Sequence, residues 1–346
     1  MKAIVFEDKG KYKLKEVPVP KIGEEDVLIK VDTCGICGTD VHIYEGTFPA
    51  NFPVIIGHEF SGIIKKVGEK VKNFKIGNAV AVNPNTACGK CKYCRNGKEN
   101  FCIAIPGLGV NYDGGFAEYV KVRESSVYLL PEKLNLEVAS FTEPLSCSLH
   151  GIDLAEIKPG HSVIILGAGP IGLIIVLLAK ISGADKIIIT DPVKKRRELA
   201  LDFGASLALD STKVNLKRET KTFLKGKAEV VIECIGNPTT QAESLNLVEP
   251  GGRVIWFGVA DPKAEIKVNP FYIYRNEITI KGCFVNPYTT ERAVRLLGEG
   301  KIKVKELITH RFGLNELDEA MQVYRKDKER IKILMKPGKV MSKVLW

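Results

Sequence analysis

The sequence predicts an α/β protein of two domains, in which a mostly β domain is joined to a doubly wound parallel sheet. Three observations carry this prediction. Residues 1–148 read as short strands separated by Gly, Pro and Asn turns. Residues 149–287 alternate near-continuous apolar strands with helices, which is typical of a parallel sheet covered on both faces. Residues 288–346 add helices and a closing strand.

Composition narrows the class of protein. The 346 residues, of which 45% are hydrophobic and 27% charged, suffice for two ordinary cores. The longest apolar run, residues 171–179, is shorter than the roughly 18 residues that cross a bilayer. The N-terminus alternates like a strand and resembles no signal peptide, so we expect a cytoplasmic protein without a membrane partner. The net charge of +10 is spread as Lys/Glu mixtures, which favours a solvated surface over a nucleic-acid partner.

The first strand of the expected parallel sheet carries a glycine motif. "VIILGAGPIG" places Gly167, Gly169 and Gly172 as G-x-G-x-x-G, around Pro170 and Ile171, between a buried strand and a helix. In that context the first glycine makes a tight turn and the second lets the backbone approach a pyrophosphate. The third lets helix and strand pack closely, and the helix N-terminus faces the phosphates. The motif therefore predicts a dinucleotide site.

The following strand indicates which dinucleotide. "KIIITD" ends in Asp191, whose carboxylate would accept hydrogen bonds from ribose hydroxyls and repel a 2′-phosphate. NAD is therefore favoured over NADP. Arg196 belongs to the basic run at 194–197, and a basic residue just beyond the acid can tolerate the phosphate, so NADP stays open as the less favoured cofactor.

Four cysteines crowd one short stretch, "ACGKCKYCRNGKENFC". Their spacing is C-x2-C-x2-C-x7-C, and they are Cys88, Cys91, Cys94 and Cys102. In a reducing compartment such clusters are metal ligands or catalytic groups, and four thiolates fill a tetrahedral structural zinc site. The alternative, a zinc ribbon that contacts nucleic acid, leaves the dinucleotide motif unexplained.

A second, mixed set of ligands favours a catalytic metal. "IIGHEFSG" holds His58 and Glu59, and "TCGICGTDVH" holds the further candidates Cys34, Cys37, Thr39, Asp40 and His42. A Cys/His/carboxylate set that is distant in sequence is the kind that leaves one coordination position open. Two alternatives are a redox pair made by Cys34 and Cys37, for which no thioredoxin-like βαβ unit is present, and a simple core histidine.

Taken together, these motifs resemble the zinc-dependent medium-chain dehydrogenase/reductase family over essentially the whole chain. The motifs, in order, are Cys-Gly-Thr-Asp (37–40), Gly-His-Glu (57–59), the four-cysteine lobe, Gly-Ala-Gly-Pro-Ile-Gly (167–172) and Gly-Gly-Arg (251–253). The resemblance implies a GroES-like catalytic domain at 1–148 and 288–346 and a Rossmann domain that binds NAD at 149–287. It also implies a homo-oligomer, either a tetramer or a dimer.

The resemblance extends to individual site residues. Cys37, His58 and Glu59 resemble the catalytic zinc ligands, and the fourth family position falls on Glu143, which touches zinc directly or through water. A glutamate followed by Pro-Leu-Ser resembles the polyol branch, of sorbitol or arabinitol type. The implied zinc count is two per subunit, one catalytic and one structural. The implied reaction is oxidation of a secondary alcohol of a polyol, a pentitol or hexitol with or without phosphate, to the ketose, with hydride transfer to NAD.

Further residues resemble a proton relay and a substrate contact. Thr39 resembles the hydroxyl that starts the family's relay, and His42 resembles its outlet. Asn286 occupies a position where sorbitol dehydrogenases carry a substrate-pocket residue, and it either hydrogen-bonds a substrate hydroxyl or caps the next turn. Two other functions stay open: L-threonine 3-dehydrogenase, which shares the zinc set, and a non-catalytic protein that only binds NAD.

Overall fold

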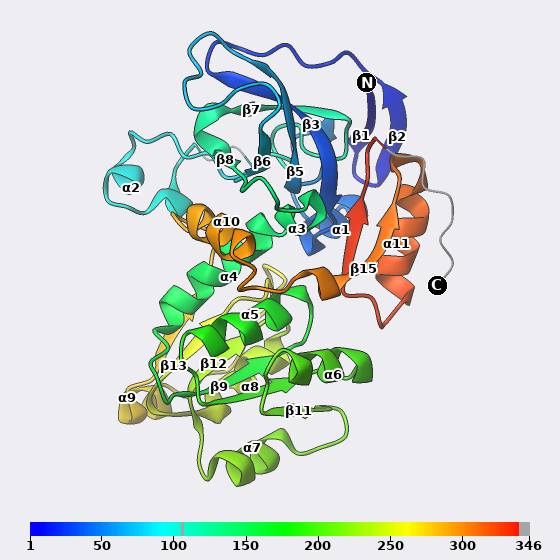
Figure 1. Cartoon of the computed structure of the whole chain (residues 1–346). Helices are drawn as coiled ribbons and strands as arrows, with labels where there is room; N and C mark the ends of the chain where they lie inside the picture. The colour runs from blue at the N-terminus through cyan, green and yellow to red at the C-terminus, as the bar shows by residue number, and fades with distance from the viewer. Residues whose placement is uncertain (105–106, 339–346) are drawn as a thin grey trace. The chain divides into compact units, whose positions relative to one another are not determined.

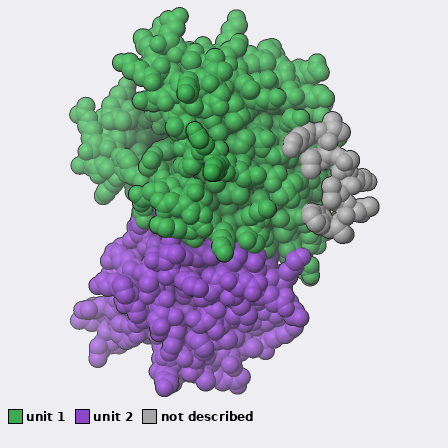
Figure 2. All heavy atoms as spheres, viewed as in Figure 1, with its two compact units in different colours: residues 1–146, 286–346 green, residues 147–285 purple. Residues whose placement is uncertain are grey.

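The computed structural model describes residues 1–104 and 107–338, which form two compact units (Figure 2). Unit 1 contains Met1–Ser146 and the chain from Asn286 onward, and unit 2 contains Cys147–Val285. The sequence predicted the two boundaries at 148/149 and 287/288. Among the described residues, no helix is both long and apolar enough to cross a membrane.

Unit 1 is built on two β-sheets (Figure 1). The larger has the order β15 (Ile308–Phe312), β16 (Lys332–Met335), β3 (Asp26–Gly35), β5 (Glu59–Val67), β6 (Ala79–Val82), β8 (Val127–Leu129), and β7 (Tyr119–Arg123) also pairs with β3. The smaller has the order β2 (Lys11–Glu16), β1 (Lys2–Asp8), β4 (Val54–Ile55). Apolar side chains of these strands, among them Phe6, Ile29 and Phe60, form one core with Phe116 of the connecting loop. The alternation seen in the sequence is therefore a set of half-buried antiparallel strands.

Short helices and turns connect these strands. The helices are α1 (Gly38–Glu45), α2 (Lys92–Arg95), α3 (Leu136–Ala139), α4 (Thr142–Ala155), α10 (Thr290–Gly298) and α11 (Leu317–Lys326). The 3-10 turns are η1 (Glu99–Phe101), η2 (Glu124–Ser126), η3 (Lys305–Leu307) and η4 (Leu314–Glu316). Helix α4 begins in unit 1 and continues into unit 2.

Three strands of the larger sheet position the candidate metal site. Gly35, at the end of β3, pairs with Glu59 at the start of β5. On its other side, the same glycine pairs with Leu334 of β16. The end of β3 and the start of β5 therefore meet β16, the last strand of the described residues, although Gly35 and Leu334 are about 300 residues apart in sequence.

Unit 2 is a six-stranded parallel sheet with helices between its strands (Figure 1). Its order is β11 (Leu207–Leu209), β10 (Lys186–Thr190), β9 (Ser162–Leu166), β12 (Ala228–Glu233), β13 (Val248–Trp256), β14 (Thr279–Gly282). The helices are α5 (Pro170–Ile181), α6 (Lys194–Asp202), α7 (Leu216–Leu224), α8 (Pro238–Leu247) and α9 (Pro270–Asn276). The first strand, β9, lies beside the fourth, β12, which is the reversal of order of a doubly wound fold and the place where such sheets bind ligands. The predicted fold class is confirmed.

Candidate active site

Cys37, His58 and Glu59 form a compact group in unit 1. One ligand atom from each lies within 4.8 Å of the others. Cys37 is the N-cap of α1, shortly after β3, while His58 immediately precedes β5 and Glu59 is its first residue. Because β3 and β5 pair at this end, residues that are more than twenty positions apart in the chain meet here.

The carboxylate of Asp40 contacts this group and fixes its orientation. Its side chain is fully buried, and Oδ2 accepts a hydrogen bond of 2.8 Å from the backbone N–H of Cys37. Oδ1 accepts one of 3.1 Å from the N–H of Gly57 and lies 3.5 Å from Nδ1 of His58. Burial disfavours a charged imidazole, but the neighbouring Asp40 and Cys37 outweigh it and raise the pKa of His58. A carboxylate behind a histidine is a common arrangement for a metal-binding imidazole.

The group fits zinc. It offers one thiol sulfur, one imidazole nitrogen and one carboxylate oxygen, which are the donor types that zinc accepts. His58 and Glu59 are buried, and Nδ1 of His58 faces Asp40, which leaves the other ring nitrogen, Nε2, for a metal. Three protein ligands leave a fourth tetrahedral position for a substrate oxygen or water, as catalytic zinc requires.

Glu143 lies outside that close group. It lies in the first turn of α4 and is 8% exposed. It is not among the residues whose ligand atoms all lie within 4.8 Å of one another. Its negative charge nevertheless acts on Lys332, which is itself in contact with Glu59. Ligation by Glu143, directly or through water, stays a prediction.

Lys332 is the member of this site that sequence reasoning missed. Its side chain is 4% exposed, and its ammonium forms an ion pair with Oε2 of Glu59. Burial lowers the pKa of Lys332, but the charges of Glu59, Cys37 and Glu143 together outweigh burial and raise it. The available signal was a lysine inside the apolar strand "RIKILM", because a lysine buried in a sheet requires a partner.

The two predicted relay residues lie on α1. The hydroxyl of Thr39 is 3.9 Å from the sulfur of Cys37, so it borders the metal group. His42 is exposed, and its Nδ1 lies 3.1 Å from the hydroxyl of Thr47. The structure therefore places Thr39 beside the site and His42 at the surface of the same helix, and the relay itself stays a prediction.

Asn286 does not face an open site. It is 1% exposed, and its Nδ2 donates to Oγ of Ser146 at 2.7 Å and to Oδ1 of Asn83 at 3.3 Å. Its Oδ1 accepts a hydrogen bond of 2.9 Å from Nδ2 of Asn85. Because both ends of the amide are used inside the protein, we leave Asn286 out of the proposed substrate site.

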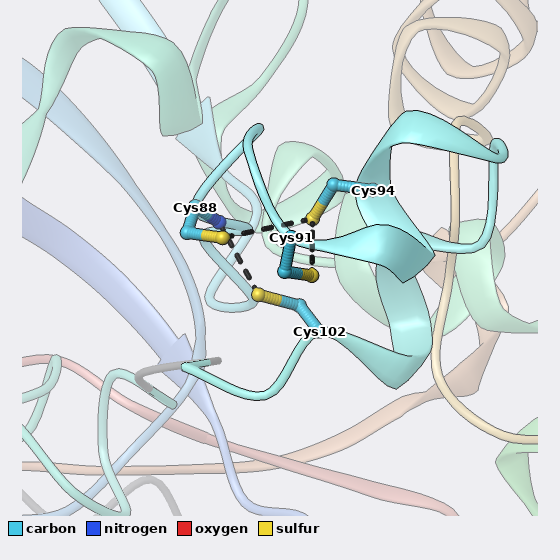
Figure 3. Close-up of side chains that lie close together, drawn as sticks. All are labelled: Cys88, Cys91, Cys94 and Cys102. Carbon is cyan, nitrogen blue, oxygen red and sulfur yellow. Dashed lines mark hydrogen bonds between the residues drawn. The ribbon is translucent and has the colours of Figure 1, made fainter.

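The four cysteines of the lobe gather around one point (Figure 3). Their sulfurs all lie within 4.8 Å of one another, with 3.5 Å between Cys91 and Cys94 and 3.9 Å between Cys88 and Cys94. Backbone N–H groups point at the sulfurs, and that of Cys94 is the largest influence that lowers the pKa of Cys91 to about 6. The set of four thiols fits a closed tetrahedral zinc site. Because α2 within the lobe buries no residue, a metal would supply the cohesion that the lobe lacks.

In unit 2, the glycine motif has the geometry that a dinucleotide needs. Gly167 adopts a φ of +99°, which favours glycine, and Gly169 is the N-cap of α5 with Pro170 at the first helical position. A Cβ on Gly169 would meet nothing within 4 Å, so the approach to the helix N-terminus is open. Ile171 follows in the first turn of the helix. Backbone N–H groups at such a terminus favour phosphate.

Asp191 joins this turn to the second strand. Its Oδ2 accepts a hydrogen bond of 3.0 Å from the N–H of Ala168, inside the motif, and its Oδ1 accepts one of 2.8 Å from Val193. Nη1 of Arg196 lies 3.6 Å from Oδ2 of Asp191. The acid that would bind a ribose and the base that would bind a 2′-phosphate are therefore neighbours.

Comparison with known proteins places the chain in a family. Residues 23–132 match the model of the alcohol dehydrogenase GroES-like domain, and residues 170–299 match the model of the zinc-binding dehydrogenases. The chain is 35% identical to D-arabinitol dehydrogenase 1 of Uromyces fabae, over 98% of this chain and 97% of the relative. It is 35% identical to sorbitol dehydrogenase of Bacillus subtilis, over 98% of each. It is 38% identical to L-threonine 3-dehydrogenase of Bacillus licheniformis, over 90% and 91%.

Solved structures agree with this assignment. A zinc-binding dehydrogenase of Sinorhizobium meliloti bound to NADP superposes with a TM-score of 0.92 at 35% identity, covering 97% of this chain and 99% of the other. An alcohol dehydrogenase of Escherichia coli in complex with NADH gives 0.92 at 31% identity, with the same coverage. The chain therefore belongs to the zinc-binding dehydrogenases, and the predicted medium-chain family is confirmed. It is an oxidoreductase of that family.

Proposed function

We propose that this chain oxidises a secondary alcohol of a polyol, a pentitol or hexitol with or without phosphate, to the ketose, with NAD as hydride acceptor. The observation that carries the chemistry is the Cys37, His58 and Glu59 group, whose donor atoms suit zinc with an open position. The full-length likeness to proteins named for arabinitol and sorbitol supports the polyol class.

Each residue of the site has a separate task in this proposal. When bound, zinc acts as a Lewis acid that lowers the pKa of a substrate hydroxyl, and the nicotinamide ring accepts the hydride. Cys37, His58 and Glu59 hold the metal, and Asp40 fixes the first two through its two oxygens. In the proposed relay, Oγ1 of Thr39, beside the Cys37 sulfur, would accept the substrate's hydroxyl proton while giving up its own, and the released proton would reach solvent at His42.

We propose two zinc ions per chain, one at this group and one at the four-cysteine lobe. The lobe supports the second ion because its four sulfurs converge within the span of a single metal. Metal analysis of the purified protein measures the count. Two zinc ions per chain in the parent and one in Cys37→Ser support the assignment, whereas a full count in Cys37→Ser contradicts it.

We propose NAD as the preferred cofactor, because the carboxylate of Asp191 would accept hydrogen bonds from the ribose hydroxyls and repel a 2′-phosphate. The guanidinium of Arg196, beside Asp191, would favour binding of the 2′-phosphate of NADP. The ratio of kcat/KM for NAD to that for NADP is the measurement. We expect Asp191→Ala to shift this ratio about tenfold or more toward NADP, which corresponds to about 1.4 kcal/mol of transition-state binding. Arg196→Ala should shift it toward NAD, and a ratio that neither variant moves would remove both residues from cofactor selection.

A substrate panel tests the reaction. NAD reduction is measured with pentitols, hexitols, their phosphates, simple diols and L-threonine, before and after chelation and in Cys37→Ser. Activity on polyols that both treatments abolish supports the proposal. Activity on threonine alone favours the second candidate function, L-threonine 3-dehydrogenase. This candidate is supported by the 38% identity to the enzyme of that name from Bacillus licheniformis. Polyol activity that survives Cys37→Ser would overturn the zinc role, and NAD binding without activity on any substrate would favour a non-catalytic protein.

We also propose that the chain forms a homo-oligomer, either a dimer or a tetramer. Phe271 and Tyr274 of α9 are 68% and 78% exposed, and a helix that presents such side chains to solvent favours association. Light scattering gives the mass of the particle in solution, and a monomer at micromolar concentration would contradict the proposal.

A further inference from the structure

Lys332 is buried in the wall of the candidate zinc site. It lies on β16, the closing strand of the larger sheet, and its side chain is 4% exposed. A buried ammonium is costly unless a counter-charge meets it, and here the ion pair with Glu59 does so. The lysine therefore contacts one of the three residues that would hold zinc.

Gly35 makes this contact possible. It separates β16 from β5 in the sheet, and a Cβ at this position would lie 2.7 Å from Cε of Lys332 and closer still to Oε2 of Glu59. A side chain on Gly35 would therefore stand between the ammonium and the carboxylate. Backbone pairing at this position does not require glycine, so the need for glycine here comes from the ion pair between Lys332 and Glu59.

The ammonium also faces the remaining negative charges of the site. Besides Glu59, the charges of Cys37 and Glu143 act on it. A zinc ion held by Cys37, His58 and Glu59 would therefore share its carboxylate with a second cation. Two cations next to one carboxylate compete for it and repel each other.

We propose that Lys332 is a positioning residue that draws Glu59 partly away from the metal and so weakens zinc binding at this site. The proposal rests on the proposed function, because it takes Cys37, His58 and Glu59 to be the zinc ligands. With zinc bound, the lysine would weaken the donation from Glu59, and the metal would then be a stronger Lewis acid toward a substrate oxygen.

Removal of the ammonium should therefore strengthen zinc binding. In Lys332→Met, which retains much of the side-chain volume, Glu59 is left without its counter-charge until a metal arrives, so the metal-free protein is destabilised. The metal-bound protein gains a full bond from Glu59 and loses the repulsion between cations. A lysine that only filled space would give the opposite sign, since its loss would loosen the site and weaken zinc binding.

The chain offers a matched control. Lys336 follows the same strand, its side chain is equally buried at 4% exposed, and it pairs with Asp32 at 2.6 Å rather than with a metal ligand. Lys336→Met should lower the stability of the metal-free and metal-bound proteins alike and leave the zinc affinity unchanged.

The experiment measures the zinc dissociation constant of the full-length protein by competition with a chromogenic chelator, and the melting temperature with and without zinc. The zinc that is absent from Cys37→Ser identifies the site. We expect Lys332→Met to bind this zinc about tenfold to 100-fold more tightly, the usual scale for partners of metal ligands. The gap between its two melting temperatures should widen, and Lys332→Arg, which keeps the charge, should stay close to the parent.

The outcomes separate this proposal from the proposed function. If Cys37→Ser retains all its zinc, the metal centre itself is wrong. If Cys37→Ser loses one zinc and Lys332→Met binds zinc with unchanged or weaker affinity, only the role of Lys332 is overturned. Should Lys332→Met not fold without metal but fold with it, the result supports the proposal. Failure to fold in both states, with Lys332→Arg also weakened in zinc affinity, overturns it in favour of a packing role.

Discussion

Replacement of Gly172 by alanine tests the packing of the dinucleotide motif. A Cβ at Gly172 would lie 3.0 Å from the carbonyl carbon of Gly167 and closer still to its oxygen, and both are backbone atoms that no rotamer change can move. Overpacking of this kind costs about 3 kcal/mol. Alanine gains about 1 kcal/mol over glycine within a helix. About 2 kcal/mol of destabilisation remains, which corresponds to a fall of about 4–8 °C in melting temperature.

Gly169→Ala is the counterpart with the opposite profile. A Cβ there meets nothing within 4 Å, and the φ of Gly169 is −69°, which alanine adopts without strain. We expect an unchanged melting temperature and a dissociation constant for NAD raised about tenfold, equivalent to about 1.4 kcal/mol. Calorimetric unfolding and NAD titration of both variants give the comparison. If Gly172→Ala melts with the parent, or if Gly169→Ala binds NAD as the parent does, our assignment of the two glycines is refuted.

Two further predictions concern unit 1. Burial alone would raise the pKa of Glu137, but Arg311 and Lys336 outweigh it and hold that pKa below its usual value. The contribution of this carboxylate to the free energy of unfolding is therefore present above pH about 4.5 and is lost as the pH falls through the lowered pKa. In urea unfolding measured from pH 7 to 3, Glu137→Gln should lose less free energy of unfolding than the parent. Chelation should make residues 88–104 sensitive to protease while far-UV circular dichroism stays nearly constant, and equal cleavage with and without zinc would contradict a metal-held lobe.

Local patterns were sufficient to predict the fold class and most of the candidate metal ligands. The four cysteines of the lobe and the pair His58 and Glu59 each lie within one short segment, so spacing alone indicates that their side chains converge. The glycine motif could be predicted in the same way, because its strand, turn and helix are contiguous in the sequence. Cys37 needed the family resemblance as well, since its proximity to His58 depends on the pairing of β3 with β5.

Asn286 and Lys332 show what local patterns leave open. The position of Asn286 after an apolar strand is compatible with a substrate contact or a cap, and only the amides of Asn83 and Asn85, some 200 residues earlier, show that its hydrogen bonds are already made. The role of Lys332 depends on the register of β16 against β3, which places it across Gly35 from Glu59. No periodicity within either segment encodes such a pairing.

The position of Lys332 in the chain also bears on why unit 1 is discontinuous. Residues 37–59 supply the three candidate ligands, yet the cation that balances Glu59 comes from the last strand of the described chain. A fragment that ended near residue 146 would leave the Cys34–Gly35 end of β3 without its β16 partner and Glu59 buried without its counter-charge, a combination that costs several kcal/mol. The segment that follows unit 2 is therefore part of the metal site as well as of the sheet, and the first 146 residues alone do not contain a complete site.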